Sequence, residues 1–113
     1  MNAQEIRIGN LLFRNKLVVT ADGLTIHDLA FFPDSIGKQY SPIPLTPEWL
    51  ERMGFKYSND LRCFYTGNYS LKETVTGRFH FCQGIAELST LEYVHQLQNL
   101  YFALTGTELS INP

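Results

Sequence analysis

Residues 55–83 read FKYSNDLRCFYTGNYSLKETVTGRFHFCQ, and this stretch decides the fold. Its apolar segments are separated by pairs with turn chemistry: Asn59-Asp60, Gly67-Asn68 and Thr76-Gly77. Within the segments apolar and polar residues alternate, which is typical of strands that bury one face. The stretch therefore predicts four antiparallel strands, over residues 55–58, 62–66, 69–75 and 78–83.

A short helix is predicted directly before these strands, over residues 47–53. Thr46 can cap it, and Pro47 fits its first turn, where no amide donor is needed. Gly54 can adopt the left-handed conformation that ends a helix. The sequence thus predicts a capped two-turn helix directly before the first of these strands.

A longer helix is predicted after the strands. Ser89 and Glu92 have the spacing of a capping box, and Gly106 follows the last apolar residue. At about 100° per residue, one arc of about 120° collects the apolar side chains: Tyr93, Val94, Leu97, Leu100, Tyr101 and Leu104. We expect this stripe to pack on the sheet.

The N-terminal residues predict three further strands in an antiparallel meander. Asn15-Lys16 offers a turn, and Asp22-Gly23 predicts a hairpin into a strand over residues 24–29. An extended connection anchored by Tyr40 and Ile43 follows. These elements predict a single α+β domain over residues 1–113. A small SH3-like barrel is one arrangement that the N-terminal strands allow.

Composition excludes several classes of protein. With 44% hydrophobic and 18% charged residues, the chain of 113 residues can form a core, so disorder is excluded as its main state. No apolar run approaches the roughly 20 residues of a membrane helix, and no leader opens the sequence. Cys63 and Cys82 lack CxxC spacing, as expected of free thiols in a reducing compartment. We therefore expect a cytoplasmic protein without membrane contact.

Nucleic-acid binding is disfavoured by charge, because nine Lys and Arg face eleven Asp and Glu, a net charge of −2. The alternative interpretation is a weak binder that uses a basic patch with one aromatic side chain on neighbouring strands. Its residues are Arg62, Tyr65, Lys72 and Arg78. A solvated sheet face explains the same residues.

A metal or thiol site is a further alternative. His80 and Cys82 lie two residues apart, so they share one strand face, and Cys63 could join them. Buried thiols and a hydrogen-bonded histidine are the simpler explanation of these residues. His27 and Asp28 do not form an acid/base pair on a strand, because neighbouring side chains point to opposite faces. We assign no catalytic, cofactor-binding or metal residue.

The polar face of the C-terminal helix is the candidate partner surface. It presents uncharged groups where a solvated helix would carry charges: His95, Gln96, Gln98 and Asn99, with Phe102 at the margin. Either a protein partner covers this face, or it packs on the N-terminal strands with its amides bonded to backbone. A second copy of the chain would make a two-fold contact.

Three stretches resemble the signature blocks of a family of small uncharacterised proteins from phages, prophages and mobile elements of anaerobic gut bacteria. They are Ile6–Leu11, Pro42–Leu50 and Val94–Gly106. The resemblance implies a cytoplasmic accessory protein of phage or mobile-element origin, and it brings no activity or cofactor. With no catalytic constellation in the sequence, we expect a non-enzymatic protein that acts through protein contacts.

Overall fold

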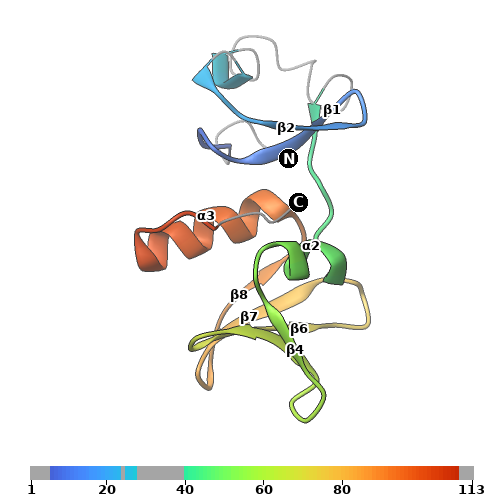
Figure 1. Ribbon diagram of the computed structural model, residues 1–113, viewed down its shortest axis with the longest axis vertical. Helices are drawn as coiled ribbons and strands as arrows, with labels where there is room; N and C mark the ends of the chain where they lie inside the picture. Colours follow the sequence, from blue (N-terminus) through green and yellow to red (C-terminus); the bar gives the residue numbers. More distant parts are fainter. Residues whose placement is uncertain (1–5, 24, 28–39, 110–113) are drawn as a thin grey trace. The chain divides into compact units, whose positions relative to one another are not determined.

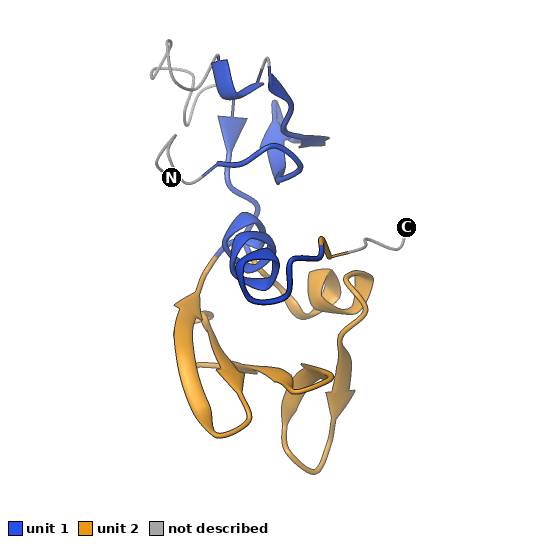
Figure 2. Cartoon of the chain, turned by 90° about the vertical axis from the view of Figure 1, so that its left-hand side faces the viewer, with its two compact units in different colours: residues 1–44, 93–107 blue, residues 45–92, 108–113 orange. Residues whose placement is uncertain are grey.

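The computed structural model describes residues 6–23, 25–27 and 40–109. They form an α+β fold with two antiparallel sheets, of three and five strands, and a C-terminal helix (Figure 1). Two compact units divide the chain (Figure 2). Unit 1 comprises residues 1–44 and 93–107, and unit 2 comprises residues 45–92 and 108–113. The expectation of one domain over residues 1–113 stays a prediction.

The sheet of unit 1 has β1 (Leu11–Arg14) at its centre, between β2 (Leu17–Thr20) and β3 (Tyr40–Ser41). The predicted turn at Asn15-Lys16 is confirmed. Both residues have positive φ, 50° and 69°, which is the signature of a two-residue type I′ hairpin loop. No closed SH3-like barrel is formed by the strands that the structure describes.

The predicted hairpin at Asp22-Gly23 is wrong. The Asp22 side chain accepts hydrogen bonds from the backbone N–H and the hydroxyl of Thr25, at 2.9 and 3.0 Å. Asp22 therefore acts as a helix cap. Gly23 and residues 25–27 are helical rather than extended, and the rest of the predicted strand over residues 24–29 lies outside the described residues.

The sheet of unit 2 is a meander in which sequential strands are neighbours. The four predicted strands are confirmed, with boundaries shifted by one or two residues. They are β4 (Lys56–Ser58), β5 (Cys63–Thr66), β6 (Tyr69–Glu73) and β7 (Phe79–Gln83). A fifth strand, β8 (Ala86–Leu91), follows a two-residue loop in which Gly84 has φ 60°.

Both predicted helices are present. In α2 (Pro47–Arg52) the Thr46 hydroxyl accepts the N–H of Trp49 at 3.3 Å, which confirms the predicted cap. Helix α3 (Val94–Thr105) ends at Gly106, as predicted, with φ 71°. Its predicted start is wrong: Ser89 lies in β8, and Tyr93 precedes the first turn.

Each unit has its own buried residues. In unit 1, Leu12 packs with the buried side chains of Ile6, Ala21 and Tyr40. In unit 2, one face of the sheet carries the buried residues Phe64, Leu71, Phe79, Phe81 and Leu91. No helix among the residues described is long and apolar enough to cross a membrane.

Candidate functional site

The amide face of α3 lies against the N-terminal strand segment. The Gln98 side-chain carbonyl accepts the N–H of Leu11 at 2.8 Å, and its Nε2 donates to the carbonyl of Gly9 at 3.3 Å. Gln98 is buried, as is His95, which stacks on Tyr93 with ring centroids 5.9 Å apart. An exposed partner surface that includes His95 and Gln98 is therefore contradicted, because unit 1 uses these residues in its own packing.

A second set of contacts joins the same helix to the residues before β1. Asn10 is fully buried; its Oδ1 accepts the N–H of Arg7 at 2.7 Å and its Nδ2 donates to Asn99 Oδ1 at 2.8 Å. Arg7 Nε donates to the same Asn99 oxygen at 3.1 Å, and its guanidinium lies over the Phe102 ring at 4.4 Å. Asn99 and Phe102 thus hold the N-terminal segment in place.

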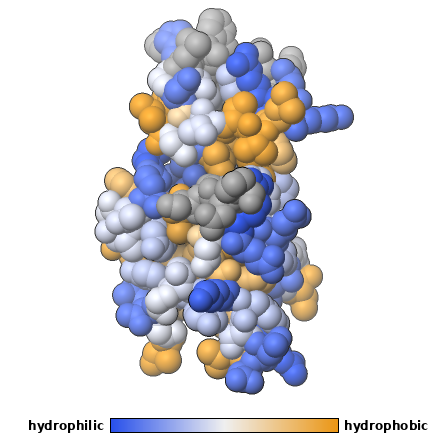
Figure 3. Space-filling model, in the orientation of Figure 1, coloured by the Kyte–Doolittle hydropathy of each residue, from blue (hydrophilic) through white to orange (hydrophobic). Residues whose placement is uncertain are grey.

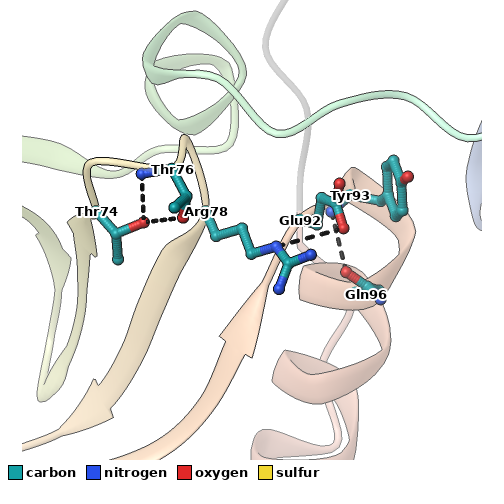
Figure 4. Close-up of polar contacts among 6 residues, drawn as sticks. All are labelled: Thr74, Thr76, Arg78, Glu92, Tyr93 and Gln96. Atoms are coloured by element: carbon teal, nitrogen blue, oxygen red, sulfur yellow. Dashed lines mark hydrogen bonds and ion pairs between the residues drawn. The ribbon is translucent and has the colours of Figure 1, made fainter.

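Gln96, the remaining member of the predicted surface, caps its own helix. Its side-chain oxygen accepts the N–H of Tyr93 at 3.0 Å (Figure 4). The predicted capping box at Ser89 and Glu92 is thereby replaced by one four residues further along the chain. Of the two interpretations of the amide face, the structure agrees with packing on the N-terminal strands.

Parts of the three stretches that carry the family resemblance meet in unit 1, whereas residues 45–50 of the middle stretch belong to unit 2. The first and the last are joined by the bonds of Asn10 and Gln98 just described. The middle stretch contributes the carbonyl of Ile43, which accepts the N–H of Val94 at 2.8 Å, and a β-bridge between Pro44 and Tyr93. The first and last stretches, together with residues 42–44, therefore contribute contacts within unit 1.

The residues of the predicted nucleic-acid patch lie on or beside one sheet in unit 2. The register sets Tyr65 opposite Ser70 and Lys72 opposite His80, so Tyr65 and Lys72 share the face that the buried residues do not occupy. Both side chains are exposed. Arg62 lies in the turn before β5, where its φ is 54°, and Arg78 precedes β7.

Acidic groups offset this patch. The Arg78 guanidinium lies 3.6 Å from the carboxylate of Glu92 (Figure 4). Residues 45–92 contain five Lys and Arg against six Asp and Glu, a local net charge of −1. The structure therefore brings an aromatic and a basic side chain together on an open face without a basic excess around them.

His80 and Cys82 also lie on this face, as their spacing predicts. His80 Nδ1 is 2.6 Å from a Glu87 oxygen and 3.2 Å from the Thr90 hydroxyl. Cys82 is half-buried, Cys63 is buried, and both are free thiols. Among the described residues, no three His, Cys, Asp or Glu side chains gather as metal ligands would. The histidine is held by hydrogen-bonding groups at the surface of the sheet, and a surface contact of this kind contributes little stability on its own.

Sequence reasoning missed Glu87 and Thr90 because it assigned no strand after Gly84. The sequence does contain a signal for that strand: Gly84-Ile85 has the Gly-first composition of a two-residue hairpin loop, as Gly67-Asn68 does between β5 and β6. Reading both pairs in the same way would have predicted β8 and placed Glu87 opposite Cys82. Thr90 lies opposite His80 only because a register shift between Phe81 and Cys82 moves the rest of the ladder by one residue.

Apolar side chains are exposed in both units, but in different patterns. In unit 1, Ile8, Leu17 and Val18 are 62%, 70% and 46% exposed, and all lie on or next to the β1–β2 hairpin. Hydrophobic side chains gather over these N-terminal strands (Figure 3). In unit 2, the most exposed aliphatic residues, Val75 and Ile85, sit singly at separate turns. Clustered apolar exposure marks an interaction surface more often than scattered exposure does.

Comparison with known proteins identifies no relative: no family model, no curated protein and no solved structure matches the chain.

Proposed function

We propose that the chain is a non-enzymatic accessory protein that works in the cytoplasm through protein contacts, in the phage or mobile-element setting that its three blocks suggest. One observation carries the proposal: Ile8, Leu17 and Val18 expose aliphatic side chains on or next to the β1–β2 hairpin, with Leu17 and Val18 on opposite faces of β2. The contact surface is thus this hairpin, whereas the polar face of α3 supports the hairpin from within unit 1.

The energetics favour a covered hairpin. Removing one exposed Leu, Val or Ile side chain fully from water is worth about 1.5–3 kcal/mol. Leu17 and Val18 expose apolar surface on both faces of β2, and a partner that meets the edge of this strand can contact both of them. The hydrogen bonds of Asn10 and Gln98 already fix the segment that leads into β1, so little conformational entropy is lost when a partner binds.

A photo-cross-linking experiment tests this proposal. Benzoylphenylalanine replaces Leu17 in the full chain, and the matched control carries it at Val75, which is more exposed but lies alone in a turn of unit 2. In cells that produce the protein, we expect covalent protein adducts from position 17 and none from position 75. Absence of any adduct from position 17 contradicts the proposed function.

A second candidate function is weak binding of single-stranded nucleic acid. The shared open face of Tyr65 and Lys72 favours it, because an aromatic ring can stack on a base while a cation meets phosphate. Fluorescence anisotropy with a labelled oligonucleotide should detect binding that weakens as salt rises. Tyr65→Ala should reduce it, whereas Tyr57→Ala, on the opposite face, should not. Binding that does not respond to salt contradicts this candidate.

A further inference from the structure

Among the residues that the structure describes, the two sheets have four edge strands, and β2 differs from the other three. Natural edge strands are kept from pairing by charges, prolines, bulges or short length. The edge strand β3 has two residues and is followed by Pro42, β4 begins with Lys56, and β8 carries Glu87 beside a register shift. In contrast, β2 reads Leu-Val-Val-Thr, with no charge, no proline and no bulge.

From this difference we propose that β2 pairs edge to edge with β2 of a second copy of the same chain. The inference rests on the proposed function and names the partner. Within the described residues, β2 has a neighbour on one side only, which is β1. Its first two side chains, Leu17 and Val18, are the exposed apolar residues that a second strand would cover.

The hairpin geometry fixes which backbone groups face the open edge. In a two-residue type I′ hairpin the flanking residues, here Arg14 and Leu17, form a hydrogen-bonded pair. Hydrogen-bonded pairs alternate along an antiparallel ladder, so Val19 also turns its backbone toward β1. The bond from Ala21 N–H to the Asn10 carbonyl, 2.7 Å, continues this alternation. The N–H and C=O groups of Val18 and Thr20 therefore point outward.

These outward groups select one register for the paired strands. If Val18 lies opposite Thr20 of the second copy, two-fold symmetry also places Thr20 opposite Val18, and each pair exchanges both hydrogen bonds. Val19 then lies on the two-fold axis. A register that sets Val18 opposite Val18 of the second copy, or Thr20 opposite Thr20 of the second copy, forms only one such hydrogen-bonded pair. The most hydrogen bonds thus come from the register centred on Val19.

Charge supports the same register. β2 is bracketed by Lys16 before it and Asp22 after it. When the register centred on Val19 is continued beyond the ends of β2, the turn residue Lys16 of each copy comes toward Asp22 of the other, whose carboxylate also caps the following helical turn; opposite charges at these positions favour the contact. A parallel arrangement would set Lys16 beside Lys16. The edge is therefore self-complementary in charge only when the two copies run antiparallel.

Light scattering after size-exclusion chromatography of the full chain tests the dimer. We expect twice the chain mass at micromolar concentrations for the wild type. Val18→Lys should give the mass of one chain, because it places a charge at the centre of the contact, while the control Val75→Lys should leave the mass doubled. Lys16→Glu should raise the dimer dissociation constant about tenfold, and Lys56→Glu should not.

Cysteine pairing tests the register. Val18→Cys and Thr20→Cys proteins, mixed under mild oxidation, should form a disulfide-linked dimer, since paired Cα atoms about 5.5 Å apart suit a disulfide. Each protein alone should give no more dimer than the wild type. A monomeric wild type, or a dimer that Val18→Lys leaves intact, overturns the inference. If the chain is monomeric yet cross-links from position 17 to a different protein, the dimer fails while the proposed function stands.

Discussion

Asn10 shows how one buried side chain can organise a unit. It is fully buried, and its amide accepts from Arg7 and donates to Asn99, so both ends of the group are used. A buried polar group with satisfied bonds fixes geometry, whereas the same group left without a partner costs free energy. The residue therefore acts as a link between α3 and the segment that enters β1.

Replacing Asn10 with Ala should lower the free energy of unfolding by about 1–3 kcal/mol, because the Arg7 N–H loses its acceptor in a buried setting. Urea denaturation measures the change. The matched control is Asn59→Ala in an exposed turn, which should stay within about 0.5 kcal/mol of the wild type. If both substitutions changed the free energy of unfolding equally, Asn10 would not be a link between α3 and the segment that enters β1.

The sequence identified the polar side chains of α3 but left open whether a partner or the N-terminal strands cover them. Helical periodicity places His95, Gln96 and Asn99 away from the apolar stripe, and it says nothing about what covers them. The residues that bond the side chains of Gln98 and Asn99 lie 87 to 92 positions away in the chain. Long-range pairing of this kind leaves no local pattern, so burial of Gln98 could not be predicted from its neighbours.

Two glycines at helix ends illustrate how elements are controlled by backbone conformation. Gly106 ends α3 with φ 71°, whereas Gly23 lies in the helical turn capped by Asp22 and has no positive φ. An added Cβ meets no atom within 4 Å at either position. Substituting alanine at these two positions therefore measures how the backbone conformation contributes to the free energy of unfolding, without a steric clash of the added Cβ.

We expect Gly106→Ala to lower the free energy of unfolding by about 1–2 kcal/mol, because the left-handed conformation disfavours a Cβ. Gly23→Ala should raise it by about 0.4–1 kcal/mol, because alanine restricts the unfolded chain at a compatible position. Thermal and urea denaturation of both variants measure these opposite signs. A change of the same sign in both would show that backbone conformation does not control these positions.

Elements that are encoded by neighbouring residues could be predicted from the sequence. The wrong hairpin at Asp22-Gly23 and the missed strand β8 show where local patterns are insufficient. Strands β4 to β7 combine alternation with turn pairs, and α2 combines a cap, a proline and a terminal glycine. Asp22-Gly23 is ambiguous, because Asp both favours hairpin turns and caps helices. In β8 most side chains are exposed, so no alternation reveals the strand, and Ser89 with Glu92 imitates a capping box.

Both units of the chain are built from two segments, but the sheet of unit 2 comes from a single one. Residues 45–92 form a sheet from neighbouring hairpins, whereas unit 1 joins residues 1–44 to α3. Each has its own fully buried leucine, Leu12 in β1 and Leu71 in β6. Because each unit has its own buried core, we expect each unit to unfold locally as a cooperative unit, independently of the other.

Hydrogen exchange followed by mass spectrometry tests this. Leu12→Ala should lower the protection of amides in residues 11–20 and spare residues 69–83, and Leu71→Ala should do the reverse. Truncation of a buried leucine costs about 2–5 kcal/mol, enough to change exchange by orders of magnitude. Uniform loss of protection in both variants would mean that the chain opens as one unit.

The discontinuity of unit 1 also sets an order of events during synthesis, since a ribosome delivers residues from the N-terminus onward. Strand β8 completes a sheet of short-range contacts, which form fast, before the first turn of α3 exists. Until residues 93–107 emerge, the nascent N-terminal hairpin lacks the amides that Gln98 and Asn99 supply to it. During translation the uncharged strand β2 is therefore present before the unit that supports it is complete. Chaperones that bind apolar segments can act on it during that interval.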